Sequence, residues 1–371
     1  MATRPVGVKH GGNSRRVPLG DIGNLITVTK TNLGSHQEQV AGGGEKNNKK
    51  VPILVAKVVQ KIRPDTDDGS LKKRKVQTYT SVLAARSKAG CAQIARSKDT
   101  IVDIDAADAT NQLAAVEYVE DLYKFYKLSE SSSVVHDYME SQPEINTRMR
   151  AILVDWLIEV HNKFELAPET LYLTIYIVDR YLSVTSVLRK ELQLVGISAM
   201  LIASKYEEIW APAVNDFVCV CDGIYSRDQV LMMEKSILKK LEWSLTVPTP
   251  YVFLVRFIKA ALPDQEMENM VFFYAELGLM HYATILYCPS MLSASAVYAA
   301  RCTLNKSPFW NETLKFHTGY AEDQLIDCAK ILVNLHAGTT LQKLQVVHRK
   351  YSSPQRNAVA LHAPAKIFVA Q

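Results

Sequence analysis

The chain has 371 residues, of which 48% are hydrophobic and 22% are charged, and its formal net charge is +5. This is enough apolar material for the cores of two or three domains. No run of 18 apolar residues occurs, so we expect no membrane-spanning helix and no membrane partner. The N-terminus carries Arg4, Lys9 and glycines instead of an apolar core, so we expect no secretory leader.

The six cysteines are scattered, mostly among apolar neighbours. Only Cys219 and Cys221 are close together, and no His or Cys cluster with zinc spacing accompanies them. The nine histidines have no metal spacing either. We therefore expect buried thiols in a reducing compartment, with no metal and no other cofactor.

The positive charge is concentrated in the first 110 residues, which hold 19 Lys and Arg against 10 Asp and Glu, an excess of +9. The remainder therefore carries −4, without the basic excess that nucleic-acid binding normally needs. Glycine clusters interrupt residues 1–110, and Tyr79 is the only aromatic residue before Tyr118. This composition predicts a disordered basic tail over residues 1–110.

From residue 112 onward the apolar residues recur at helical spacing, beginning with Tyr118, Leu122, Phe125 and Tyr126. Prolines separate the helical stretches, and the alternation typical of strands is missing. The pattern predicts an all-α protein with an N-terminal helix. Further helices are expected over about 147–162, 168–184, 190–208, 227–241, 249–261, 267–284, 289–303 and 322–336.

A weak internal repeat relates residues 197–205 to residues 294–302 at an offset of 97. Both segments are rich in small residues, which allow close packing at the centre of a helical bundle. The proline-containing break at 247–250 lies between the two copies. We therefore predict two tandem five-helix domains, over 112–246 with the preceding helix and over 247–340, followed by a C-terminal extension over 341–371.

Residues 149–158 form an apolar run that has two apolar sides on a helix. One arc consists of Met149, Ile152, Leu153, Trp156 and Val160. The other consists of Ala151, Val154, Leu157 and Ile158. Such a helix is either central to a domain or packed on one side and presented to a partner on the other. The second arc is the better core candidate, whereas the first is compatible with either role.

Several motifs now resemble a known family. Residues 149–157 and 201–208 are similar to the first cyclin box, residues 161–164 are similar to the B-type signature, and residues 79–88 are similar to plant members. The chain thus resembles a B-type mitotic cyclin, continuously over about 112–340. The expected fold is then two tandem cyclin boxes behind an N-terminal helix and a disordered tail.

The resemblance implies a regulatory subunit that binds and activates a cyclin-dependent serine/threonine kinase at G2/M, helps select its substrates, and moves between nucleus and cytoplasm. Lys205 and Glu234 match the kinase-contacting Lys and Glu of cyclins, and Glu208 is a further candidate. The alternative for these residues is an ordinary helix-end charge. The motifs of phosphate-binding loops, serine hydrolases and kinase catalytic loops are absent, so we expect no catalysis by the chain itself.

The resemblance also assigns two structural features to the first box. Met149, Ile152, Leu153, Trp156 and Gln193 would line a groove for Arg-x-Leu segments of substrates or inhibitors, although periodicity alone is equally satisfied by a core. Arg150 and Asp179 would form an ion pair between the first two helices of the box.

Short motifs in the two terminal regions point to regulation. Arg16, Leu19, Ile22 and Asn24 keep the spacing of the extended destruction box, which implies degradation through the anaphase-promoting ubiquitin ligase. Lys72, Lys73, Arg74 and Lys75 are either a nuclear import signal or a solvated charge run. Ser353, followed by Pro354 and Arg356, is either a proline-directed phosphorylation site or a turn.

Two other classes of protein fit the sequence less well. A DNA-binding protein of the transcription factor IIB type has a similar two-box fold, but this chain has neither a Cys-x-x-Cys zinc ribbon nor a basic folded part. A scaffolding solenoid normally needs three or more repeats, whereas this sequence shows two.

Overall fold

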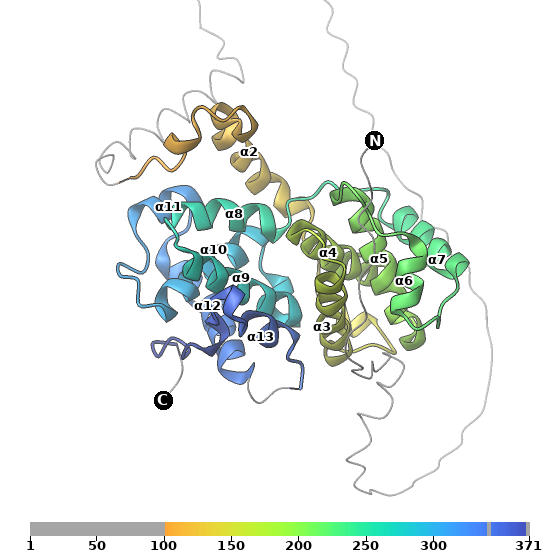
Figure 1. Ribbon diagram of the computed structural model, residues 1–371. Helices are drawn as coiled ribbons and strands as arrows, with labels where there is room; N and C mark the ends of the chain where they lie inside the picture. Colours follow the sequence, from red (N-terminus) through yellow and green to blue (C-terminus); the bar gives the residue numbers. More distant parts are fainter. Residues whose placement is uncertain (1–100, 340–342, 369–371) are drawn as a thin grey trace, which may run out of the picture. The chain divides into compact units, whose positions relative to one another are not determined.

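The computed structural model describes residues 101–339 and 343–368 (Figure 1). Every regular element in these ranges is a helix, which confirms the all-α prediction. The destruction-box residues (Arg16, Leu19, Ile22 and Asn24) and the import candidates (Lys72–Lys75) lie outside the described residues.

The first five-helix domain is built around α5, which packs against α4, α7 and α3. Residues Leu192–Ser204 of α5 are all buried. A Cβ atom on Gly196 would stand 2.8 Å from Leu153 Cδ1, so the glycine permits the close approach of α5 to α3. The five helices are α3 (Thr147–Lys163), α4 (Pro168–Val184), α5 (Leu192–Glu207), α6 (Val214–Val220) and α7 (Arg227–Lys240).

The second five-helix domain has the same plan around α10, which packs against α8, α12 and α9. Its helices are α8 (Pro250–Ala260), α9 (Gln265–Met280), α10 (Pro289–Thr303), α11 (Glu312–Thr318) and α12 (Glu322–Gly338). The two copies of the predicted repeat therefore lie on the two central helices, α5 and α10. Small residues recur in both because each helix is surrounded by others.

Local chemistry explains where the helices begin. Pro168, Pro250 and Pro289 occupy the first turns of α4, α8 and α10, where a missing N–H costs nothing. Asn146 caps α3 by accepting from Met149 N at 3.0 Å. These signals are visible in the sequence, so most predicted helix boundaries lie within two residues of those in the structure. The exception is the helix predicted over 267–284, because α9 ends at Met280 and a separate 3-10 helix follows over Tyr282–Leu286. The short helices α6 and α11 were not placed in advance.

The predicted N-terminal helix is α2 (Val116–Ser129), which has no buried residue. It is attached to the second domain by the Tyr123 hydroxyl, which donates to Val252 O at 2.9 Å, and by Lys127, which lies over the Tyr320 ring at 3.6 Å. Glu130 follows the helix and accepts from both the backbone N–H and the hydroxyl of Ser290. This carboxylate therefore also caps the start of α10.

Two predicted boundaries differ from the structure. Disorder was predicted up to residue 110, but Ile104 is buried and Asp105 forms ion pairs with Arg256 (2.6 Å) and Lys259 (2.8 Å). A separate extension was predicted after residue 340, but Tyr351 at the end of α13 (Val346–Tyr351) is fully buried. Both segments are ordered by partners far away in the sequence, which local composition does not reveal.

Candidate functional site

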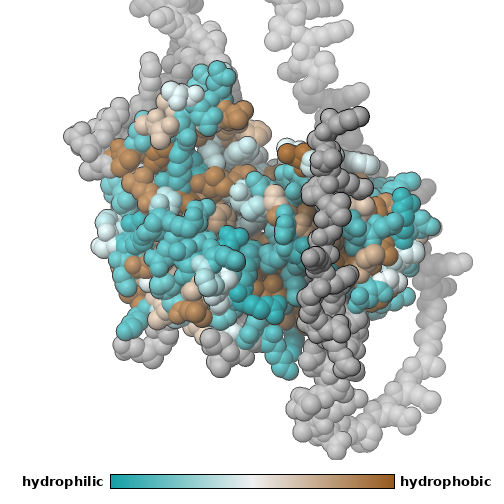
Figure 2. All heavy atoms as spheres, viewed as in Figure 1, coloured by the Kyte–Doolittle hydropathy of each residue, from teal (hydrophilic) through white to brown (hydrophobic). Residues whose placement is uncertain are grey.

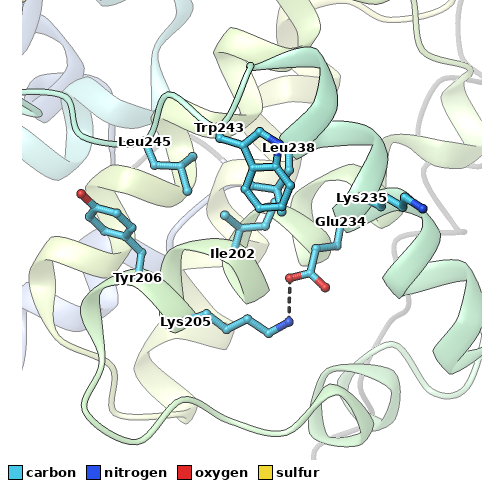
Figure 3. A pocket seen from close by; sticks show the side chains of 8 residues that line it. All are labelled: Ile202, Lys205, Tyr206, Glu234, Lys235, Leu238, Trp243 and Leu245. Atoms are coloured by element: carbon cyan, nitrogen blue, oxygen red, sulfur yellow. Dashed lines mark hydrogen bonds and ion pairs between the residues drawn. The ribbon is translucent and has the colours of Figure 1, made fainter.

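An open pocket of about 430 Å³ lies where the end of α5 meets α7 and the segment after it. Its wall is mainly apolar, with charged side chains along one edge (Figure 3). The lining residues are Ile202, Lys205, Tyr206, Glu234, Lys235, Leu238, Trp243 and Leu245. The pocket thus brings together Lys205 and Glu234, two of the three residues that the sequence analysis assigned to partner binding.

Lys205 and Glu234 form an ion pair, with Nζ 2.6 Å from Oε1. The lysine side chain is 46% exposed, whereas the glutamate side chain is 13% exposed. An ion pair this close to solvent contributes little to folding stability, because water competes for both charges. The pair is therefore better suited to present one cation and one anion, in a defined position, to groups on another molecule.

Two aromatic side chains stand on either side of this pocket (Figure 3). Trp243 is 70% exposed and has a left-handed backbone, with φ of 60°. Its backbone N–H donates to Leu238 O at 3.0 Å. Tyr206 is 47% exposed, and its hydroxyl lies 2.6 Å from Thr246 Oγ1. Exposing large apolar side chains is unfavourable unless a partner covers them, so the pocket has the character of a protein-binding surface.

Glu208, the third residue assigned to partner binding, does not line this pocket. Its Oε1 accepts from Ala167 N at 2.8 Å and from the Thr170 hydroxyl at 2.5 Å. The carboxylate therefore caps the start of α4 from a distance of about forty positions along the chain. A partner contact of Glu208 stays a prediction. By fixing the end of α5, the carboxylate also holds the base of the loop that carries Ile209 and Trp210, each 90% exposed.

The predicted peptide groove is largely core. Met149, Leu153 and Gln193 are buried, with exposed fractions of 2%, 0% and 5%. Only Ile152 and Trp156 of the predicted groove are half-buried and reach the surface. On the opposite arc of α3, Val154, Leu157 and Ile158 are buried and Ala151 is half-buried. A helix wheel separates the two arcs but does not tell how deeply a neighbouring helix covers each of them.

Arg150 and Asp179 are brought together in the core, with two hydrogen bonds of 2.6 Å from Nε and Nη2 to the two carboxylate oxygens. Arg150 Nη1 also donates to Leu279 O at 3.0 Å, at the end of α9. Asp179 accepts a further hydrogen bond of 2.8 Å from the Tyr138 hydroxyl. The pair therefore joins the first domain to the second, in addition to linking α3 with α4.

Apolar surface is also visible over α2 (Figure 2). Tyr118, Leu122 and Phe125 share one face of this helix and are 59%, 41% and 62% exposed. The opposite face holds Tyr123, which packs near Phe253 of α8. This face is a second partner-binding candidate, although nothing in the structure shows what covers it.

Three exposed aromatic residues, Tyr206 and Trp243 of the pocket and Trp210 beside it in the chain, were not among the predicted site residues. A signal was present for Trp243, since residues 241–245 alternate apolar and polar residues directly before the prolines of the linker. Alternation there breaks the helical period and leaves one large side chain without a helical neighbour to cover it.

Other kinds of site find no support in the described ranges. No group of three or more His, Cys, Asp or Glu side chains there could hold a metal ion. The five cysteines between residues 101 and 368 carry free thiols. No helix in this part of the chain is both long and apolar enough to cross a membrane.

Two tandem five-helix domains, each around a central helix rich in small residues, are the architecture expected of two cyclin boxes. The chain belongs to the cyclin family, since residues 121–246 match the family model "Cyclin, N-terminal domain" and residues 248–365 match "Cyclin, C-terminal domain". The second match extends beyond residue 340, in agreement with the packing of α13.

Curated relatives agree with this assignment. The chain is 64% identical over 313 residues to G2/mitotic-specific cyclin S13-6 of Glycine max, covering 84% of this chain and 69% of that one. It is 62% identical over 342 residues to G2/mitotic-specific cyclin-2 of Antirrhinum majus (92% and 76% covered) and 58% identical over 315 residues to Cyclin-B1-2 of Arabidopsis thaliana (85% and 70% covered). The predicted resemblance to plant B-type mitotic cyclins is confirmed.

Among solved structures, the fold resembles that of a viral cyclin from herpesvirus saimiri. The TM-score is 0.52 at 20% sequence identity, and the match covers 57% of this chain and 95% of the viral one. At this level of identity the likeness supports the fold alone.

Proposed function

We propose that this chain is the regulatory subunit of a cyclin-dependent serine/threonine kinase, which it binds and activates at the G2/M transition without catalysis of its own. The observation that carries the proposal is the exposed apolar pocket with the Lys205–Glu234 pair at its edge. Membership of the cyclin family and the similarity to proteins named G2/mitotic-specific cyclins support it.

The pocket suits a helix of the kinase. Tyr206, Trp243 and Leu245 offer apolar contact for a side chain of that helix, while Lys205 and Glu234 can pair with polar groups beside it. An active protein kinase needs a lysine–glutamate ion pair, and the glutamate is carried by a mobile helix. A partner that binds only the inward position of this helix shifts the kinase population toward the active state by its difference in affinity.

The test mixes the full chain with a monomeric cyclin-dependent kinase and measures phosphorylation of a peptide substrate. Addition of the chain should raise the rate by orders of magnitude. Exchanging the charges, Lys205→Glu with Glu234→Lys, preserves the internal ion pair but reverses its polarity toward the kinase. It should weaken kinase binding roughly tenfold or more.

A matched control exchanges the ion pair of α11, Lys315→Glu with Glu312→Lys, whose two atoms are 2.7 Å apart on the surface of the second domain. This variant should bind the kinase like the wild type. Equal affinity of the wild type and the Lys205/Glu234 variant would remove the pair from the interface, and an absent rate increase with folded wild type would end the proposal.

We further propose that the chain helps to select substrates or inhibitors with Arg-x-Leu segments through the surface at Ile152 and Trp156. Trp156→Ala should then slow phosphorylation of a substrate that carries the motif, while a short peptide without it is phosphorylated at the wild-type rate. An equal loss on both substrates would instead make Trp156 a core residue.

The basic residues Lys72–Lys75 support a proposal that the chain is imported into the nucleus in a cell-cycle-dependent manner and is otherwise cytoplasmic. Replacing all four residues by alanine in a fluorescent fusion should retain the protein in the cytoplasm. Unchanged nuclear accumulation would reduce this segment to a solvated charge run.

A further inference from the structure

Residues 343–368, here called the C-terminal strap, carry five Lys and Arg residues and no Asp or Glu. The helix of the strap, α13, packs against both α3 of the first domain and α9 of the second. Its polar contacts with these helices are mainly to carboxylates. They are Val346 N to Asp155 (3.1 Å), Arg349 to Glu159 (3.6 Å), and Lys350 and the Tyr351 hydroxyl to Glu276 (2.6 Å each).

Ser353 lies directly after α13, within this strap. The full sequence contains three Ser-Pro or Thr-Pro pairs, which begin at Thr249, Ser307 and Ser353. Only the last has a basic residue three positions after the hydroxyl residue, namely Arg356, because Val252 and Trp310 occupy that position in the other two. The sequence therefore ranks Ser353 first as a substrate of proline-directed kinases.

The structure separates the three positions further. Thr249 is buried, with 8% exposed, at the start of α8. Ser307 is exposed, but the carbonyl oxygens of Pro308 and Phe309 both accept from Arg301, and Trp310 is only 4% exposed. The residues that a kinase would need to read after Ser307 are therefore locked into the second domain.

Ser353 has the opposite setting. Its backbone is extended, with φ of −72° and ψ of 146°, and it is half-buried. Residues 354–357 after it are all exposed. Its hydroxyl is engaged only by donating to Lys350 O at 3.0 Å, in the preceding helix. Residues Pro354–Arg356 form a short 3-10 helix, and the backbone N–H groups of Arg356 and Ala358 donate to Ser353 O at 3.0 Å. This turn is exposed and held by local bonds, so an enzyme that opens it can reach the hydroxyl, the proline and the arginine.

We propose that Ser353 is the phosphoacceptor of a proline-directed serine/threonine kinase that selects a basic residue three positions later. In this step Ser353 Oγ bonds to the γ-phosphorus of ATP, the bond from that phosphorus to the β–γ bridging oxygen breaks, ADP leaves, and the hydroxyl proton is released. This kinase belongs to the class that the chain is proposed to activate, and only that link rests on the proposed function.

The phosphate would act on the strap. It carries nearly two negative charges and only accepts hydrogen bonds at neutral pH, so the bond to Lys350 O is lost. The cations three positions away on either side are already in use, because Lys350 pairs with the buried Glu276 and Arg356 lies over the Tyr351 ring at 5.7 Å. Drawing them toward phosphate weakens the anchoring of α13, and phosphorylation should therefore loosen the strap.

The experiment incubates the full chain with ATP and an active cyclin-dependent kinase whose activating subunit is a different protein, and maps phosphate by mass spectrometry. Phosphate is expected on Ser353 in the wild type and in Ser307→Ala. It should be absent from that position in Ser353→Ala and slower to appear in Arg356→Ala. The assignment would be overturned if Ser353→Ala left the total phosphorylation of residues 343–368 unchanged. It would also be overturned if the wild type carried phosphate on Ser307 and not on Ser353.

Hydrogen exchange of the same samples tests the consequence for the strap. Amides of α13 should exchange several times faster in the phosphorylated wild type than in Ser353→Ala treated identically, while amides of α5 are unchanged. Equal exchange in α13 would overturn the loosening. Because the kinase is supplied in active form, failure of this chain to activate a kinase of its own would leave both readouts intact.

Discussion

Trp243 shows how a single residue can mark a binding surface. The side chain is 70% exposed, although burial of a tryptophan is among the largest apolar gains available to a protein. Its left-handed backbone is held by the hydrogen bond from its own backbone N–H to Leu238 O, which fixes the point from which the side chain leaves the main chain. A backbone that is already fixed loses little conformational freedom on binding, which favours a role as an anchor.

We expect Trp243→Ala to weaken kinase binding by about 2 kcal/mol, the usual cost of removing an aromatic anchor from an interface. The free energy of unfolding should change little, since most of the ring is exposed. Calorimetric titration and urea unfolding measure the two quantities. Leu286→Ala, at a residue 62% exposed in the second domain, is the control. A Trp243 variant that loses stability but not affinity would place the residue in the fold alone.

His336 makes stability depend on pH. Burial lowers its pKa from 6.5 to about 4, and its ring nitrogens face the Tyr274 hydroxyl at 3.0 Å and Ala360 O at 3.3 Å. Because the pKa of His336 is lower in the folded state than in the unfolded state, its contribution to the free energy of unfolding is fully present above pH 6.5. That contribution is lost as the pH falls toward 4. From this residue alone we expect a loss of about 1 kcal/mol between pH 7.5 and 5.5.

The measurement is urea unfolding of the wild type and of His336→Gln at both pH values. The quantity compared is the change in the free energy of unfolding between the two pH values, not the absolute stability. The variant should show a shallower loss. Asp155 acts in the opposite direction, because burial raises its pKa to about 6 and its contribution is lost as the pH rises through that value. It is present in both proteins and cancels in the comparison, so equal slopes would contradict the role of His336.

At the scale of elements, the same device starts helices in both domains. Glu208 caps α4 and Glu130 caps α10, and in each case the first helical residue is a proline. The carboxylate comes from a distant part of the chain and satisfies N–H groups that the helix itself cannot use. Each cap therefore fixes the position of one element relative to another, in addition to satisfying polar groups at the start of a helix.

Glu208→Ala should lower the free energy of unfolding by about 1 kcal/mol, the typical cost of losing a helix cap. Glu208→Gln keeps an oxygen acceptor and should lose less. Both variants should bind the kinase more tightly than Trp210→Ala does, because Trp210 is the exposed residue of this loop and Glu208 is not. A Glu208→Ala variant of normal stability and weakened binding would place this residue in the interface.

At the scale of the whole molecule, the two domains are similar in plan and different in use. Lys205 at the end of α5 reaches solvent, whereas the position matching it at the end of α10 is the buried Cys302. The domains are joined through Arg150, which reaches the end of α9, and through the C-terminal strap. One domain can thus present the pocket while the other and the strap support it.

Regulated destruction would act at this scale, because degradation removes the entire chain. We propose that Arg16, Leu19, Ile22 and Asn24 are recognised by the anaphase-promoting ubiquitin ligase at mitotic exit. Arg16→Ala with Leu19→Ala should lengthen the lifetime of the protein through that stage, as followed by immunoblotting of synchronised cells. Arg15→Ala, one position outside the spacing, is the control, and unchanged turnover of the double variant would discredit the signal.

The sequence by itself determined the helices, the repeat and the family. Apolar spacing, prolines and caps are local signals, and they placed α3, α4, α7 and α10 within a residue or two of their final bounds. The Arg150–Asp179 pair was also named from the resemblance and lies together in the structure. Lys205 and Glu234 were named as separate partner contacts, and the structure joins them in an ion pair.

Only the tertiary structure decided which side chains remain exposed. It buried Met149 and Leu153, turned Glu208 inward as a cap, left Trp210 and Trp243 uncovered, and ordered the strap across both domains. The physical reason is that the helical period depends on neighbouring residues, whereas burial depends on partners that are far away in the sequence. A binding surface is defined by what the fold leaves uncovered, and that is known only once the helices are packed.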